Sequence, residues 1–493
     1  MPDMRPRFAA LAVAALIVRL SAGYLIVGRL MTPPPTPIAR EPSPTASSRS
    51  ASPSQSQSPS ATPLPSPRPT QTPKPRASPK PTSAPRNTVN RTSIALVATY
   101  DVAVSLNYGT RALRVNETIN VRNASGGSID HLELNTVTAR IGALRLRSVT
   151  VGGIAIQARI EDQTIVVPFD QTLLNGASTR IGLAFSATLR ADLAGSNWLF
   201  TRFNGIVDAN RWLPWISLPR PFDRPNNGDP FFTASSPRVT VRITTDRTLV
   251  IATTGDRIGS SGLSQTFEAR NVRDFNFTAS PAYRVSEARV GATTVRLYST
   301  SGYPASTVLS YATDALARMG KLVGTYPYAT FTVAQSAGGY GMESPQMIWI
   351  QGGLSGNQLK WLVYHETEHQ WFYGLVGSDE AYQPFADEGA GDHLARTVSG
   401  VWRSSNCSSG RLDLSIYQYS SACYFETIYV QGAILLQQVH HRMGDTAYWR
   451  ATRDYVAARR FGIGSTAALL NNLQAHTTVN LRPILAPRFP SLY

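Results

Sequence analysis

The sequence predicts a multidomain fold in which an all-β domain is followed by an α+β domain whose C-terminal half is mostly helical. Three observations predict it. Residues 1–91 are poor in core-forming side chains after an apolar start, residues 92–287 alternate between apolar and polar positions, and residues 288–493 change to a helical period. With 42% apolar residues, the 493-residue chain can fill two cores, since domains commonly run to about 100–200 residues.

Residues 1–31 have the order of an export signal. An apolar run from Phe8 to Val18 follows two arginines, and a second apolar stretch follows Arg19. Cleavage after Gly23 would make the segment a signal peptide, whereas reading through to Met31 would make it a membrane anchor. A buried helix of the fold is the remaining interpretation. Export in either form places the folded part outside the cytoplasm, secreted or held at the cell surface.

Residues 32–91 predict a disordered stalk, because a run of Pro, Ser, Thr and Ala with scattered basic residues, as in TPKPRASPKPTSAPR, cannot bury a core. We expect it to hold the folded part away from a membrane or to thread a cell wall, with its charges solvated or in contact with wall polyanions. Residues 1–91 carry twelve Lys and Arg against Asp3 and Glu41, ten of the sixteen net positive charges. The remaining chain is only mildly basic and implies no nucleic-acid partner.

Residues 92–287 are predicted to form the all-β domain of twisted, packed sheets. The segments YDVAVSLNY and LRVNETINVRN alternate as half-buried strands do, and SVTVGGIAIQARI places Gly152 and Gly153 in a two-residue hairpin turn. No long helical period interrupts this pattern.

Residues 288–493 begin with strands and then turn helical. VRLYS, TFTVAQSA and QMIWIQG are predicted strands, and STVLSYATDALARMGKLVGTY is a helix of 3.6-residue period. Further helices are predicted over Ser355–Val376, Phe385–Val398, Ala422–Met443 and Thr446–Arg459, with Ser465 capping a last one.

An HExxH motif spans His365 to His369 in the apolar segment WLVYHETEHQWFYGLV. Residues four apart share a helix face, so both imidazoles can bind one zinc ion, and Glu366 lies beside them to accept a proton from the attacking water. Catalytic zinc usually takes a third protein ligand. Glu388 in FADEGAGDHLA supplies it, with Asp387 as the alternative ligand or as the partner of a ligating histidine. The competing interpretation is a core helix with two hydrogen-bonded histidines.

The chain resembles the gluzincin aminopeptidases typified by aminopeptidase N, peptidase family M1, in three features. These are the segment HETEHQWFYGLVG, the spacing of eighteen residues between His369 and Glu388, and the DEG around Glu388. GYGMESP is similar to the GxMEN strand of that family, and TIYVQGAILL resembles the segment with its catalytic tyrosine. YDVAVSLNY, the RDF at Arg273 and YPYATFTVAQ extend the likeness over residues 92–493.

The resemblance implies an N-terminal β sandwich or saddle, a thermolysin-like catalytic domain with one zinc ion per chain, and two further site residues. Glu343 would bind the free amino group of the substrate, and Tyr429 would donate a hydrogen bond to the oxyanion. Without the likeness, Glu343 is a strand-edge carboxylate and Tyr429 a core aromatic.

The chain departs from the family pattern at several points. Ser344 stands where the family usually has Asn, and Glu368 is an extra carboxylate beside a ligand, interpreted as a solvated charge. We expect the large helical domain of many relatives to be absent, which would leave the cleft more open to longer peptides.

Cys407 and Cys423 are predicted to form a disulfide in an oxidising compartment, sixteen positions apart. Closing such a loop stabilises a fold by about 3 kcal/mol and would pin a segment between Glu388 and Tyr429. The alternative is two free buried thiols.

The predicted function is a zinc aminopeptidase that releases the first residue of peptides with a free amino terminus. An endopeptidase with the same zinc chemistry is the nearest alternative, and a catalytically inactive surface scaffold or adhesion module is the other.

Overall fold

The computed structural model describes residues 89–222 and 231–493, all within one compact unit. The predicted export segment over residues 1–31 lies outside the described residues, as does nearly all of the predicted stalk. In the two described stretches, no helix combines the length and apolar character needed to cross a membrane.

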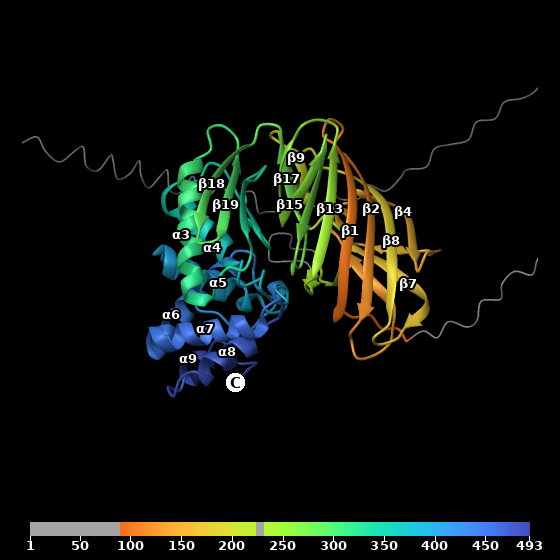
Figure 1. The fold of residues 1–493 in the computed structure, drawn as a ribbon. Helices are drawn as coiled ribbons and strands as arrows, with labels where there is room; N and C mark the ends of the chain where they lie inside the picture. The colour runs from red at the N-terminus through yellow and green to blue at the C-terminus, as the bar shows by residue number, and fades with distance from the viewer. Residues whose placement is uncertain (1–88, 223–230) are drawn as a thin grey trace, which may run out of the picture. The chain divides into compact units, whose positions relative to one another are not determined.

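An eight-stranded sheet dominates the first part of the chain (Figure 1). Its strand order is β15 (Asp256–Ser261), β16 (Ser264–Ala269), β13 (Arg238–Thr245), β1 (Leu96–Asn107), β2 (Ala112–Asn123), β8 (Ser178–Thr188), β4 (Leu144–Val151) and β5 (Ile154–Ala155). Because alternate residues of β1 and β2 face the core, the predicted period-2 strands are confirmed. The predicted hairpin turn is confirmed as well: Val151 pairs with Ile154, and Gly152 and Gly153 both have positive φ.

Two further groups of strands share one apolar core with this sheet. One group consists of β12 (Phe231–Thr233), β11 (Trp215–Pro219), β3 (Ile129–Asn135), β7 (Thr164–Leu173) and β6 (Arg159–Glu161), and the other of β14 (Val250–Thr253), β17 (Phe277–Ser280), β10 (Ile206–Ala209) and β9 (Phe200–Phe203). Only the short helices α2 (Val137–Arg140) and η1 (Asn197–Leu199) interrupt the described strands before β18.

A second core holds the helical part of the chain. Its five-stranded sheet has the order β18 (Arg284–Val290), β19 (Thr293–Ser299), β20 (Thr330–Gln335), β22 (Met347–Ile350) and β21 (Met342–Ser344). The helices are α3 (Ala305–Val323), α4 (Gly356–Glu368), α5 (Glu388–Ser399), the π-helical turn η4 (Glu426–Gln431), α6 (Gly432–Met443), α7 (Asp445–Arg459), α8 (Thr466–Ala475) and α9 (Arg482–Leu485), with η2 (Pro384–Ala386), η3 (Ile416–Gln418) and the strand pair β23 (Val376–Gly377) and β24 (Gly462–Ile463) between them.

The β-rich part followed by a mostly helical part is confirmed, while the thermolysin-like detail and the predicted domain boundary at residue 287 stay predictions. Strand β18 runs across that boundary and pairs with β19.

Three predicted helices have the wrong extent. The helix predicted to reach Val376 ends at Glu368, because the chain turns there and Tyr373 takes a φ of 125°. The helix predicted from Phe385 is divided into η2 and α5 at Asp387. The helix predicted from Ala422 begins as the π-helical turn η4.

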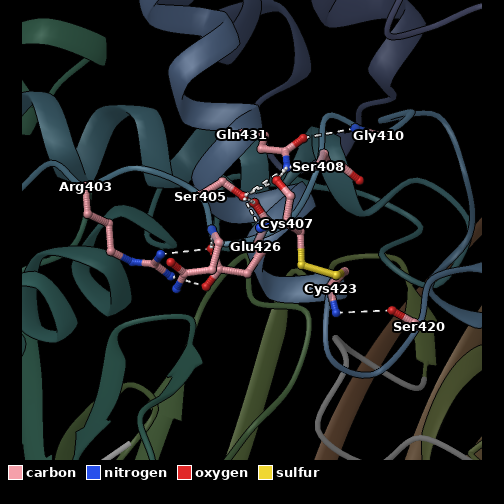
Figure 2. The surroundings of a disulfide bond; sticks show 10 residues. Arg403, Ser405, Cys407, Ser408, Gly410, Ser420, Cys423, Glu426 and Gln431 are labelled. Carbon is pink, nitrogen blue, oxygen red and sulfur yellow. Dashed lines mark hydrogen bonds and ion pairs between the residues drawn. A yellow bond between two sulfur atoms is a disulfide. The ribbon is translucent and has the colours of Figure 1, made fainter. Parts of the chain in front are cut away.

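Ser465 caps α8 as predicted, since its side chain accepts a hydrogen bond from the Ala468 N–H. It is not the cap of the last helix, because α9 follows. The predicted disulfide is confirmed: Cys407 and Cys423 are bonded, with their Cα atoms 5.9 Å apart (Figure 2).

Candidate active site

Three buried side chains converge where α4 meets α5. The Nε2 atoms of His365 and His369 lie 3.3 Å apart, and each lies 3.4 Å from Oε2 of Glu388. A tetrahedral zinc ion with bonds of 2.0–2.1 Å would hold its ligands about 3.3–3.4 Å apart, so the triangle matches such an ion. Oε2 of Glu388 is buried, and apart from its 3.4 Å contacts with the two imidazoles it has no hydrogen-bond partner in the described structure, which leaves it available for a metal. These residues therefore fit zinc.

Two glycines allow α5 to approach its neighbours closely. A Cβ atom at Gly391 would lie 1.8 Å from Oε1 of Glu368, and one at Gly389 would lie 2.6 Å from the Phe385 ring. Glu388 is the first residue of α5, where the helix dipole favours a carboxylate. Gly391 thus lets α5 pack closely against α4, where the two histidines lie.

Hydrogen bonds behind the ligands orient the imidazoles. Nδ1 of His369 lies 2.8 Å from Oδ1 of Asp387 and 3.0 Å from the Phe372 carbonyl, which turns Nε2 toward the triangle. Nδ1 of His365 makes no hydrogen bond in the described structure, but it lies 3.6 Å from Oδ1 of Asp392, close enough for an ion pair. Asp387, predicted as an alternative ligand or as a histidine partner, is therefore the hydrogen-bond partner of His369.

The metal-free site holds protons that a cation would displace. Burial disfavours the charged form of His365, but the neighbouring carboxylates of Asp392 and Glu388 outweigh it and raise its pKa to about 10. The pKa of His369 is raised well above its usual value despite burial, because the carboxyl groups of Glu368, Asp387 and Glu388 surround its ring. Burial opposes ionisation of Glu388, yet the two imidazoles 3.4 Å away lower its pKa.

Glu366 lies beside the ligand triangle under the loop before β21. Burial raises its pKa to about 8, against the opposing charges of the two histidines. A Cβ atom at position 341 would lie 2.3 Å from Oε1 of Glu366, so Gly341 leaves the space that this carboxylate occupies. A carboxylate with a pKa near neutrality can accept and return a proton.

Glu343 lies on the edge strand β21, and its carboxylate, that of Glu366 and a ring nitrogen of His369 offer atoms within 4.8 Å of one another. The side chain of Gln370 ties this strand to the end of α4. Its Nε2 donates to the Ser344 carbonyl at 2.9 Å, and its Oε1 accepts from the Gln346 N–H at 2.8 Å. The chain next to Glu343 is thereby held at a fixed distance from the histidines.

Ser344, where the family usually has Asn, is fully buried in a polar network. Its Oγ donates to Oδ1 of Asp274 at 2.9 Å, accepts from Nδ2 of Asn276 at 3.0 Å, and lies 2.9 Å from Oγ1 of Thr254. Asp274 also pairs with Arg211 at 2.7 Å. Ser344 thus joins strand β21 to the β-rich part of the chain.

Tyr429 lies in η4 and reaches the same triangle. Its hydroxyl donates to Oε1 of Glu388 at 2.5 Å, and its ring centroid is 5.3 Å from that of His365. Burial, reinforced by the charge of Glu388, raises the pKa of the phenol well above its usual value. The phenol is therefore a neutral hydrogen-bond donor at physiological pH.

The interpretation of Glu368 as a solvated charge is wrong. Its side chain is fully buried, and neither carboxylate oxygen has a hydrogen-bond partner in the described part of the chain. Oε1 lies 3.4 Å from Nδ1 of His369. Burial raises its pKa well above the usual value. Gly391 makes the room that admits this side chain, and helix periodicity alone gave no sign of it.

Gln370 and Asp392 are two site residues that were not predicted, although both had a detectable signal in the sequence. Gln370 follows the HExxH motif directly, and Asp392 is four residues after Glu388 on the same face of a helix, where it also accepts a hydrogen bond from Trp361 at 2.7 Å. A charged or amide side chain inside an apolar helix often has a buried partner.

No protein-family model matches the chain, and no curated protein matches it either. Among solved structures the chain is similar to an M1 zinc metallopeptidase from Deinococcus radiodurans, with a TM-score of 0.62 and 18% identity over 80% of this chain and 95% of that one. A mutant of that enzyme bound to a Tyr-Ser-Ala substrate gives 0.61 and 17% over 80% and 93%. A two-domain M1 zinc metallopeptidase mutant bound to L-arginine gives 0.62 and 17% over 80% and 94%. The chain therefore has the fold of M1 zinc metallopeptidases, as its motifs predicted.

Proposed function

We propose that this chain is an exported zinc aminopeptidase that hydrolyses the first peptide bond of peptides with a free amino terminus. The observation that carries the proposal is the buried triangle of His365, His369 and Glu388, whose edges of 3.3–3.4 Å match a tetrahedral zinc ion. A fold shared with M1 zinc metallopeptidases, one of them crystallised with a peptide substrate, supports it.

In the proposed hydrolysis, each residue around that triangle has a separate role. Bound zinc would polarise the scissile carbonyl and lower the pKa of a water molecule. Glu366 accepts the proton of the attacking water and passes it to the leaving amine. Tyr429, kept protonated by burial, donates to the oxygen on which negative charge develops.

Glu343 is the proposed reason for the preference for amino termini. A carboxylate on the strand edge beside the ligands can bind an ammonium group, so that only the first peptide bond reaches the reactive centre. Gln370 keeps the strand of Glu343 at its place relative to α4.

Export is part of the proposal and depends on the order of residues 1–31 and on the disulfide, which is typical of oxidising compartments. Peptides are the proposed substrates, and contact with a membrane or cell wall would be made through residues 1–91.

The test uses residues 84–493, the compact unit. Zinc content is measured, and the protein is assayed on aminoacyl chromogenic amides and on free and N-acetylated copies of one peptide, with and without a chelator. We expect one zinc ion per chain and chelator-sensitive cleavage of free substrates only. Equal cleavage of acetylated peptides would favour the endopeptidase, and a protein with neither metal nor turnover would favour the scaffold.

A further inference from the structure

The disulfide lies in a loop that is packed against both ends of η4, the π-helical turn that carries Tyr429 (Figure 2). We call residues 403–410 the clamp loop. Cys423 lies three residues before η4, so the bond joins the clamp loop to the chain that leads into the turn.

The first residue of η4 is held by an ion pair with the clamp loop. Arg403 donates to both oxygens of the Glu426 carboxylate, at 2.6 and 2.9 Å, and the Asn406 N–H donates to Oε2 at 2.8 Å. Glu426 is 5% exposed and the Arg403 side chain 36% exposed, so the carboxylate of this bidentate pair is shielded from water while the guanidinium is partly solvated.

The last residue of η4 is held by an amide. Nε2 of Gln431 donates to Oγ of Ser405 and to the carbonyls of Cys407 and Ser408 at 2.9–3.0 Å. Its Oε1 accepts from the Gly410 N–H at 3.1 Å and from Arg488 at 2.8 Å.

A π-helical turn needs such support, because it contains one more residue than an α-helical turn and is rarely stable alone. If η4 relaxed into the register of α6, each side chain would rotate by about 100°, one residue of an α-helix. The Tyr429 hydroxyl would then leave Glu388.

We infer that the Cys407–Cys423 bond, Glu426 and Gln431 are positioning elements that hold η4 in its π-helical register and so place the Tyr429 phenol. The catalytic part of this inference rests on the proposed function. Reduction of the bond loosens the clamp loop and lowers turnover while the proposed zinc ligands, which lie on α4, at its C-cap and on α5, stay in place.

The bond is open to that reaction, because both cysteines are only half-buried and their neighbours Ser408 and Ala422 are exposed. A water-soluble phosphine supplies the two electrons: it takes the oxygen of one water molecule to become the phosphine oxide, and the two water protons end on the two thiols.

Amide hydrogen exchange tests the clamp without reference to activity. In zinc-loaded protein, reduction with the phosphine, or the double change Cys407→Ser and Cys423→Ser, is expected to accelerate exchange at residues 426–432 by about 10-fold or more. Unchanged exchange in the reduced protein would overturn the inference, whether or not the protein is a peptidase. Because reduction is done on folded protein, a serine variant that fails to fold does not block the test.

Kinetics test whether the clamp acts through Tyr429. Glu426→Gln is expected to lower kcat by about 10-fold or more, with KM and zinc content unchanged and no further loss in a Tyr429→Phe background. Glu287→Gln is the matched control, because it removes the exposed ion pair with Arg296 on β18 and β19 and is expected to leave kcat unchanged. If Glu426→Gln lowered kcat in the Tyr429→Phe background by as large a factor as in the wild type, that result would contradict a positioning role. A wild-type protein without turnover would refute the proposed function and leave the exchange result standing.

Discussion

Zinc affinity is expected to rise steeply with pH, because the metal-free site holds two protons that zinc must displace. The pKa of His365 is about 10 and that of His369 is raised well above its usual value, so both imidazoles are charged at neutral pH. The two neighbouring imidazoles lower the pKa of Glu388 despite its burial, so this third ligand contributes no proton there. Metal ligands bind as the deprotonated imidazole, and each proton released changes the affinity tenfold per pH unit.

Two displaced protons therefore predict that the zinc dissociation constant falls about 100-fold for each unit of pH between about 5.5 and 7.5. Competition with a chromophoric chelator of known pH dependence measures it at constant ionic strength. The buried His393 does not change this count of protons, since burial lowers its pKa to about 3 and it stays neutral over the whole pH range. A tenfold slope or less per pH unit would refute the reasoning and show that one or both histidines are neutral before zinc binds.

Three further predictions concern single side chains. Tyr429→Phe should lower kcat by roughly 10²–10³-fold with little change in KM, measured by steady-state kinetics, and a change confined to KM would limit the phenol to substrate binding. Glu343→Ala should lower kcat/KM for free-amine peptides by about 10–100-fold and abolish the preference over acetylated ones, whereas an unchanged preference would place the amine anchor elsewhere. Burial raises the pKa of Glu117, which has no hydrogen-bond partner in the described structure, so this carboxyl costs stability as pH rises through its folded-state pKa. Glu117→Met should therefore raise the free energy of unfolding at pH 7 by about 1–3 kcal/mol in denaturant titrations, with a smaller gain toward pH 4, and a gain independent of pH would argue for packing alone.

The sequence predicted that His365, His369 and Glu388 would lie together, because this convergence depends largely on local rules. Residues His365 and His369 share a helix face by their spacing alone, and Glu388 follows from the chemistry that demands a third ligand. The period-2 strands and the Gly152–Gly153 turn are local in the same sense, and they too are found as predicted.

What the sequence could not predict depends on contacts between distant segments. Ser344 bonds Asp274, seventy residues earlier in the chain, and Glu368 is buried only because Gly391 on another helix makes room. Hydrophobic periodicity could not predict the π-helical register of η4. A helix that contains one π-helical turn has only one residue more than the matching α-helix, so the two apolar patterns are nearly the same.

The most direct measurement of the central claim is the activity of Glu366→Gln with its zinc content measured on the same sample. The two carboxylate oxygens of Glu366 become an amide that cannot accept the proton, while the three ligand atoms are untouched. The account predicts one zinc ion per chain and a loss of kcat of several orders of magnitude. Zinc-loaded Glu366→Gln protein with activity near that of the wild type would contradict it, because the proton would then have another acceptor.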